Sequence, residues 1–342
     1  MENKVRNSNI ELLRILCMFF IIMHHSFYHS YLNTNLTGIN YYLLYGLQFL
    51  GKMSNNIFVL ITGYYMVDKE INKKSIKKTI FKTLFYSYVI LIIYILITHN
   101  IDFNIILSSL VPLSFNNNWF VISYILLYIS IPIINILISN LSQKQYEKTL
   151  IILVVILSVF PTIKLLQNAF STYIWFICLY MIGAYIKKYK FNLKYKKENN
   201  ILLLISFLFF YIFVTVTNIF KLELGNMGEI NSFIMLIMAL STFVFWVNKK
   251  EWNNKGINYI SSSVLGIYLI HDNFIIRHHI WEFFKIEKHL SDPYFFVYEI
   301  GIILFVFCSC LIIDKVLEKF VFKHIVNKHF ADKNKQKELI KI

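Results

Sequence analysis

Charged residues are scarce in this sequence. Only 15% of its 342 residues are charged, whereas apolar residues (AVILMFWYC) make up 57% and the mean hydropathy is +0.56. A single soluble domain is excluded, because the apolar surface exceeds what one soluble core of this length can bury. We therefore expect a lipid bilayer to be the solvent of this chain.

Cysteine is also scarce, and its positions exclude two kinds of stabilisation. No cysteine has a zinc-type spacing to histidine, and all of them fall inside apolar segments. The four cysteines are Cys17, Cys178, Cys308 and Cys310. We predict neither a disulfide framework nor a metal site, and we interpret these cysteines as packing residues.

The first apolar segment lacks the small-residue cleavage site of a signal peptide. It carries Arg14, His24 and His25 instead, so we interpret it as a helix that stays in the protein. No connection between the apolar segments is long enough for a separate folded domain. We therefore predict one polytopic membrane domain over residues 1–342.

Apolar segments of about 17 to 25 residues recur along the whole chain, and each can cross the hydrocarbon core as a helix. The sequence predicts an all-α integral membrane fold with about ten transmembrane helices. Their expected positions are 10–29, 41–66, 79–99, 119–138, 148–166, 171–186, 201–219, 229–247, 258–276 and 295–314. The second segment is interrupted by the polar residues 51–56, and the fifth contains Pro161.

The net charge of +15 is unevenly distributed along the chain. With the N-terminus inside, 27 of the 34 Lys and Arg residues fall on the inner side of the predicted spans and five on the outer side. The positive-inside rule therefore predicts ten spans with both termini in the cytoplasm. This distribution argues against nucleic acid as a partner, and it places residues 315–342 as a basic cytoplasmic tail near anionic lipid.

The first predicted helix has the densest set of polar residues inside a span. Arg14 and His25 are eleven residues apart, so they share one helix face and stand about 16 Å apart along the axis. Glu11 falls on the same face, whereas His24 points about 100° away. Arginine suits a phosphorylated ligand, and an imidazole suits proton abstraction near neutral pH. The alternative is that Arg14 snorkels beside Glu11 and the histidines only bond neighbouring helices.

Other polar positions near the spans also have two interpretations each. Lys52 would bind an anionic group or lie in a local break of the second span. Asn118 and Trp119 would line a cavity, or Trp119 would be an interfacial aromatic residue. His271, next to Asp272, would belong to a proton relay or pack as a satisfied histidine.

A group of lysines follows the second predicted span. They form an ordinary positive-inside loop or bind an anionic ligand from the cytoplasm. These residues are Lys73, Lys74, Lys77 and Lys78.

The order of these features resembles the membrane acyltransferase 3 family. The first helix of that family carries a basic residue and a histidine separated by ten residues, a spacing that Arg14 and His25 match. Its Phe-Phe-x-x-Ser-Gly-Tyr segment is similar to residues 57–64, with Thr62 in place of serine. The basic loop that follows is all lysine here, where arginine is more usual, and this weakens any bidentate contact.

The resemblance continues to the end of the chain. Trp119, Tyr128 and Pro132 fit the Trp-Phe-Leu helix of the family with its later Tyr and Pro, and residues 266–271 fit a motif near its end. Members with an attached extracytoplasmic esterase-like domain often have a glutamate where this sequence has Tyr124, and that domain is absent from it. The likeness is therefore to stand-alone members that modify capsule or exopolysaccharide, including the intercellular-adhesion polysaccharide type.

The resemblance implies transfer of an acyl group, most often acetyl, from an acyl-CoA donor to a hydroxyl of a cell-surface glycan, without a metal. His25 would remove the hydroxyl proton or relay the acyl group, and Arg14 would bind the coenzyme A phosphates or steady the thioester oxygen. The four loop lysines are further candidates for donor binding. The candidate residues of the substrate cavity are His24, Lys52, Asn118, Trp119 and His271.

Two other classes of protein compete with this interpretation. A transporter of polysaccharide or of a small anion would use the same intramembrane Arg, His and Lys residues, although we see no inverted repeat and no matching pair of broken helices. A noncatalytic scaffold for a polysaccharide synthase would leave the spacing of Arg14 and His25 unexplained.

The composition and the family resemblance also predict the location and the partners of the protein. The richness in Asn, Lys, Ile and Phe fits an AT-rich bacterial genome. We therefore expect a multi-pass protein of the plasma membrane, with the lipid bilayer, a glycan acceptor and polysaccharide synthesis machinery as partners.

Overall fold

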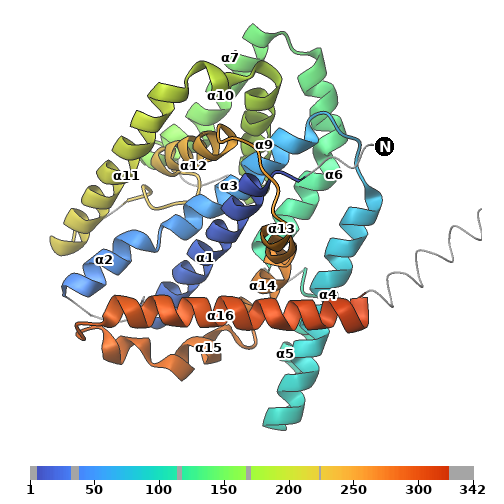
Figure 1. Cartoon of the computed structure of the whole chain (residues 1–342), viewed down its shortest axis with the longest axis vertical. Coiled ribbons are helices and arrows are strands. Elements are labelled where there is room, and N and C mark those ends of the chain that lie inside the picture. Colours follow the sequence, from blue (N-terminus) through green and yellow to red (C-terminus); the bar gives the residue numbers. More distant parts are fainter. Residues whose placement is uncertain (1–5, 32–37, 114–117, 167–170, 223–224, 323–342) are drawn as a thin grey trace, which may run out of the picture.

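The computed structural model describes residues 6–31, 38–113, 118–166, 171–222 and 225–322. These residues form helices and turns without a strand, which confirms the all-α prediction for this part of the chain (Figure 1). Of the predicted basic tail, 315–342, the structure describes residues 315–322, which form the end of the last helix, and the prediction for the rest lies outside the described residues.

The helices follow one another with short connections. The first part of the chain forms α1 (Ser8–Tyr31), α2 (Ile39–Leu47), α3 (Leu50–Met66), α4 (Lys73–Thr98), α5 (Phe103–Leu110) and α6 (Trp119–Asn140). The middle part forms α7 (Gln143–Val154), the π-helix η1 (Val155–Val159), α8 (Phe160–Thr162), α9 (Thr172–Tyr189), α10 (Phe191–Lys194), α11 (Lys196–Ile219) and α12 (Phe233–Val247). The last part forms α13 (Lys255–Ser261), α14 (Val264–His271), α15 (Arg277–Phe284), the 3-10 helix η2 (Ile286–His289), α16 (Phe295–Leu317) and the π-helix η3 (Glu318–Phe322).

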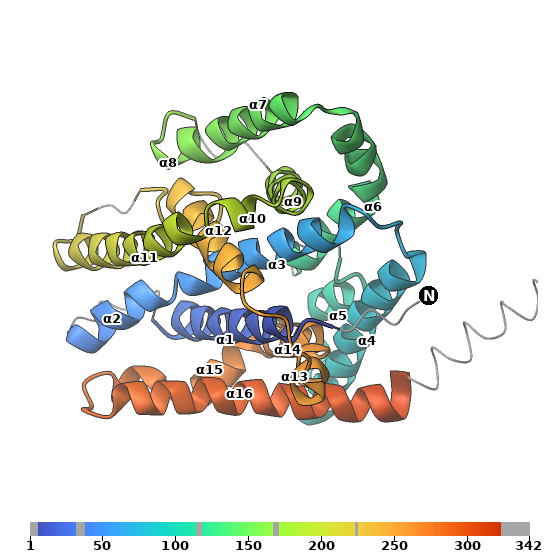
Figure 2. The same cartoon turned by 45° about the horizontal axis from the view of Figure 1, so that its top comes forward.

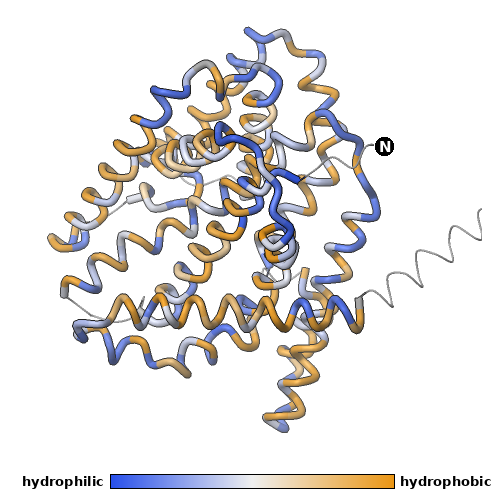
Figure 3. The backbone as a smooth tube through the Cα atoms, in the orientation of Figure 1, coloured by the Kyte–Doolittle hydropathy of each residue, from blue (hydrophilic) through white to orange (hydrophobic). Residues whose placement is uncertain are grey.

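Six helical segments of the described chain are long and apolar enough to cross a membrane. They are Ser8–Ser30, Lys73–Thr98, Trp119–Asn140, Gln143–Thr162, Lys196–Ile219 and Phe295–Val321. Other predicted spans correspond to shorter helices, such as α3 with 17 residues and α12 with 15. Hydrophobic residues dominate the long helices, as in α11 and α16 (Figure 3). The chain is therefore a helical membrane protein, while the total of ten spans stays a prediction.

Two predicted spans are broken in the middle. The segment 41–66 consists of α2 and α3, which meet at Gln48 and Phe49, and the polar residues 51–56 lie inside α3 rather than in an interruption. The segment 258–276 contains α13 and α14, which are separated at Ser262 and Ser263. Mean hydropathy does not reveal such breaks, because a few polar residues leave the average over a whole span apolar.

Polar residues fix where several helices begin. Asn72 accepts a hydrogen bond from the Lys74 backbone N–H at the start of α4. Ser142 and Gln145 form a capping box at the start of α7, and Asn254 accepts from the Ile257 backbone N–H at the start of α13. Each cap satisfies a backbone donor that the first turn of the helix leaves unpaired.

The helices pack in layers around α1 and α3. Figure 2 shows α16 on one side of α1, with α3 on the other side, followed by α9 and then α7. The contact between α3 and α9 is very close, because a Cβ atom on Gly63 would lie 2.1 Å from the Tyr180 carbonyl oxygen. A Cβ atom on Gly183 would lie 2.3 Å from the Leu60 carbonyl oxygen. Small residues allow such approach between membrane helices.

Several connections between helices contact one another, and the charge pattern assigns them all to the same side of the membrane. The Ser8 hydroxyl at the start of α1 donates to the Asn258 side chain, and the Asn9 side chain donates to the Lys250 carbonyl oxygen. Asn192, between α9 and α11, exchanges hydrogen bonds with Asn248 at the end of α12. These bonds place the N-terminal end of α1, which carries Arg14, beside the basic connections.

Candidate active site

A cavity of about 400 Å³ lies between α1, α3, α4, α6 and the segment 261–268. Its residues change character along α1 and α14. Charged and hydroxyl groups surround one end, namely Arg6, Glu11, Arg14, Lys78, Ser262 and Glu318. Aromatic and aliphatic groups line the rest of it, with Tyr124 and Tyr128 on the side of Arg14 and Ile21, Phe58, Phe120 and Tyr268 farther along. The cavity thus offers an ionic end and an apolar end to one elongated ligand.

Arg14 lies at the ionic end, where its side chain is 36% exposed. Its guanidinium Nη1 is 3.5 Å from Glu11 Oε1 on the same helix. The other carboxylate oxygen of Glu11 accepts a hydrogen bond of 2.5 Å from the Ser261 hydroxyl. Because guanidinium has five N–H donors, the contact with Glu11 leaves donors for an anionic ligand.

His25 pairs with His271, a residue 246 positions away in the sequence. His271 Nδ1 lies 2.7 Å from the Ile267 carbonyl oxygen, which can only accept, so Nδ1 carries the proton. In a neutral His271 ring Nε2 is then an acceptor, and it lies 3.0 Å from His25 Nδ1, which must donate. This arrangement leaves the lone pair of a neutral His25 on Nε2, where a general base needs it.

A carboxylate lies close to the histidine pair. Asp272 Oδ1 is 3.7 Å from His25 Nδ1. At this distance a negative charge stabilises an imidazolium that forms during proton transfer. His25 therefore has one residue that fixes its tautomer and another that favours its protonated state.

Tyr268 connects the cavity with the histidine pair. It lines the apolar end, and its ring centroid lies 6.5 Å from that of His25 and 6.1 Å from that of His271. The Tyr268 hydroxyl is buried and has the Asp272 side chain as a polar neighbour. His25 itself, with a side chain 16% exposed, lies one side-chain layer beyond the cavity.

The other residues that the sequence assigned to a substrate cavity do not line this one. His24 Nδ1 lies 2.6 Å from Gln48 Oε1, at the break between α2 and α3. Lys52 Nζ lies 3.7 Å from Glu229 Oε2, and the Asn118 side chain donates to the Pro112 carbonyl oxygen. Trp119, at the start of α6, is exposed. Their roles in substrate binding stay predictions.

Only one of the four candidate loop lysines reaches the cavity. Lys78 lines its ionic end, with Nζ 4.0 Å from Glu318 Oε1. Lys73, Lys74 and Lys77 are exposed at the start of α4 and do not line it. One turn further along α4, Lys82 Nζ lies 2.6 Å from Asp314 Oδ1 of α16, a buried ion pair that fixes this end of α4.

Sequence reasoning missed an aromatic stripe on α6. Phe120, Tyr124 and Tyr128 all line the cavity, and the Tyr124 hydroxyl lies 3.0 Å from the Thr62 hydroxyl of α3. Their spacing of four residues, which places them on one helix face, was the available signal. Ser261 and Ser262 gave no such signal, because they reach the cavity through the break before α14.

Comparison with known protein families assigns this chain to a family of acyltransferases. A family model described as an acyltransferase domain matches residues 7–314, which include the whole cavity except Arg6 and Glu318. No curated protein and no solved structure matches the chain significantly. The match covers most of the chain, from the residue before α1 to the last turn of α16. The chain therefore belongs to the acyltransferase 3 family and is a membrane acyltransferase.

Proposed function

We propose that this protein transfers an acetyl group, or another short acyl group, from coenzyme A to a hydroxyl of a cell-surface glycan or exopolysaccharide. The observation that carries the proposal is the cavity that leads from Arg14 to the neighbourhood of the His25–His271 pair. Its ionic end suits phosphate groups and its apolar end suits an acyl thioester. No metal takes part in this proposal.

The donor fits the cavity in one direction. The phosphates contact Arg14 and Lys78 at the ionic end, and the pantetheine arm points along α6 toward Tyr268. A volume of about 400 Å³ is near the lower limit of small-molecule pockets, which favours the arm with a short acyl group over a long fatty chain. The lysines 73, 74 and 77 lie outside, where they attract the anionic donor by charge.

The chemistry needs one base and one donor to the thioester oxygen. His25 Nε2 takes the proton of the acceptor hydroxyl, whose oxygen attacks the thioester carbonyl carbon. The Tyr268 hydroxyl donates to the carbonyl oxygen as negative charge develops there. The carbon–sulfur bond then breaks, the thiolate takes the proton from His25, and the products are the glycan ester and free coenzyme A.

The cellular setting follows from the same reasoning. We place the protein in the plasma membrane of a bacterium, with the ionic end of the cavity on the cytoplasmic side, where coenzyme A thioesters are found. The basic connections that surround this end support that orientation. A glycan at the opposite side, delivered by polysaccharide synthesis machinery, would approach His25 through the outer half of α1.

Donor binding and product formation together test the proposal. We expect calorimetry on purified protein to show acetyl-CoA binding that weakens at least tenfold in Arg14→Ala, since hydrogen bonds to charged groups contribute about 1.5–3 kcal/mol. Lys52→Ala, which removes a cation outside the cavity, should keep the affinity of the wild type. In cells, the host polysaccharide should gain the mass of acetyl groups only when the protein is present. Vesicle uptake of an anion or glycan without acylation would instead favour a transporter.

A further inference from the structure

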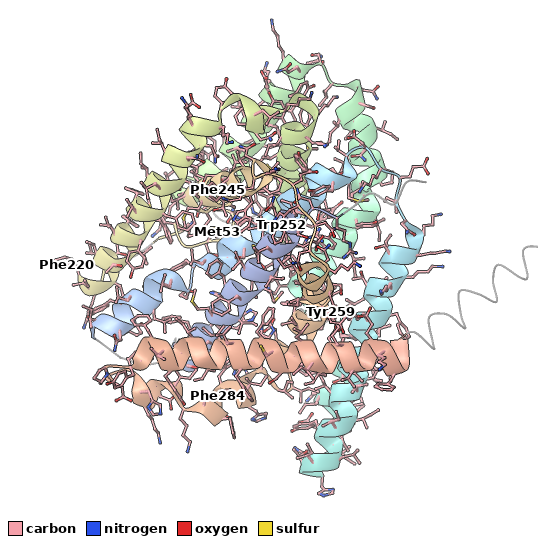
Figure 4. The ribbon with its side chains drawn as sticks, in the orientation of Figure 1. Met53, Phe220, Phe245, Trp252, Tyr259 and Phe284 are labelled. Carbon is pink, nitrogen blue, oxygen red and sulfur yellow. The ribbon has the colours of Figure 1, made fainter. Side chains whose placement is uncertain are left out.

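A second hollow, of about 460 Å³, lies between the start of α1, the start of α11 and the end of α12. Its polar lining consists of three lysines and three asparagines, namely Lys196, Lys249, Lys250, Asn9, Asn200 and Asn248. It contains none of the residues that line the candidate active site. Figure 4 labels Phe245, the aromatic member of its lining, and the nearby Trp252.

Hydrogen bonds hold the backbone of this hollow in place. The Asn9 side chain donates to the Lys250 carbonyl oxygen at 2.7 Å and accepts from the Trp252 indole N–H at 2.6 Å. Asn248 donates to the Asn192 carbonyl oxygen at 2.9 Å. The lysines are thus presented by a connection that is tied to α1 and to the segment before α11.

The three lysines of the hollow have no carboxylate partner in the described part of the chain. No carboxylate oxygen of the described residues lies within 4 Å of the ammonium groups of Lys196, Lys249 or Lys250. Lys249 Nζ lies 4.2 Å from the centroid of the Phe245 ring, which is part of the same lining. The site therefore suits an anion and not a cation.

An apolar ridge continues from the hollow along α11. Lys196, Asn200, Leu204 and Leu208 follow one another at intervals of four residues, so each lies next to the following one on a ridge that winds slowly around the helix. Leu204 and Leu208 are 63% and 53% exposed, as expected of side chains that face lipid. The positive-inside rule requires basic loops, but it requires neither a hollow lined by three lysines nor an apolar ridge that begins at that hollow.

We propose that this hollow binds the phosphate headgroup of an anionic phospholipid, with one acyl chain of the lipid along Leu204 and Leu208. Basic pockets between membrane helices on the cytoplasmic side bind such headgroups. The lipid would hold the start of α1 through Asn9, five residues before Arg14. This binding is separate from the proposed acyl transfer and does not depend on it.

Native mass spectrometry of the purified full-length protein tests the site. Phosphatidylglycerol is titrated against phosphatidylcholine on the wild type and on two triple variants. The first variant removes the charge of the hollow and combines Lys196→Gln, Lys249→Gln and Lys250→Gln. The second removes the same amount of charge elsewhere and combines Lys144→Gln, Lys148→Gln and Lys255→Gln. We expect the first triple variant to bind the first phosphatidylglycerol about 100-fold more weakly than wild type, and the second to bind it nearly as wild type does.

Three results would overturn the assignment. Equal binding of the two lipids by the wild type would show no recognition of the anionic headgroup, and equal losses in both triple variants would show only a general charge effect. Displacement of the lipid by inorganic phosphate or coenzyme A, with the same dependence on the three lysines, would make the hollow a site for a soluble phosphate ligand. Thermal unfolding of both variants, with and without phosphatidylglycerol, shows whether they are folded and gives a second measure of binding.

Discussion

At the scale of single residues, His24 and His25 differ in their partners more than in their chemistry. His24 contacts Gln48 at the break between α2 and α3, whereas His25 contacts His271 and lies beside Tyr268. If His25 is the general base, His25→Ala should lower the acyl-transfer rate about 10²–10⁴-fold. His24→Ala removes the same atoms one position earlier in the same helix and should retain most of the activity. Expression-matched variants, assayed with labelled acetyl-CoA, make the comparison, and a larger loss in His24→Ala would move the site to another face of α1.

His271 is a positioning residue for His25, and its effect should appear in kcat more than in KM. His271→Ala removes the acceptor that fixes the His25 tautomer, and misplacement of a catalytic group by about 1 Å can cost about 10²-fold. His271→Gln carries an amide oxygen that can accept from His25 Nδ1, so we expect it to recover part of kcat. A packing histidine without this role would give no difference between Gln and Ala once both variants are shown to be folded.

The sequence predicts which residues of one helix share a face, but not what faces them across the bundle. Helical spacing placed Arg14 and His25 on one side of α1, and the structure places Arg14 in the cavity and His25 one layer beyond it. The contact of His25 with His271 joins residues 246 positions apart, and no local spacing contains that information. For Lys52, the position within a predicted span suggested an anionic ligand or a local break. The structure instead places the Glu229 carboxylate of the same chain beside its ammonium group.

At the scale of elements, the packing of α3 against α9 depends on two glycines that face carbonyl oxygens. Gly183→Ala would bring a Cβ atom to 2.3 Å from the Leu60 carbonyl oxygen, so the helices must separate. Overpacking of this kind costs about 1–3 kcal/mol, and we expect a lower unfolding temperature in detergent. Gly301→Ala in α16 is the matched control, because nothing lies within 4 Å of its added Cβ atom. An equal effect of both substitutions would argue against close packing of α3 on α9.

Hydropathy predicted where helices run, but not where they break. It gave single spans over 41–66 and 258–276, yet each contains two helices. The breaks at Gln48–Phe49 and Ser262–Ser263 are too short to lower the mean hydropathy of a span, although the second lies in a run of three serines. They also matter for the site, since Ser262 lines the cavity and Gln48 contacts the His24 ring next to His25. Tertiary contacts, which a linear pattern does not contain, decide such positions.

At the scale of the whole molecule, the orientation in the membrane decides which compartment supplies the donor. Helix α11 has 24 residues and is about 36 Å long, which is enough to place the segments at its two ends on opposite sides of the bilayer. Leu193, before the helix, and Leu222, after it, are 64% and 60% exposed. The charge pattern predicts that Leu193 lies in the cytoplasm, together with the ionic end of the cavity, and Leu222 outside.

Cysteine labelling of these two positions tests that orientation. In a background without the native cysteines, Leu222→Cys should react with an impermeant maleimide in intact cells, and Leu193→Cys should react only after the membrane is permeabilised. The physical reason is the strong excess of lysine around Leu193, which the positive-inside rule keeps in the cytoplasm. The opposite pattern would invert the protein and place Arg14 at the outer surface, away from coenzyme A. Labelling of both positions in intact cells would show that α11 does not span the bilayer, and the ten-span topology would then be wrong.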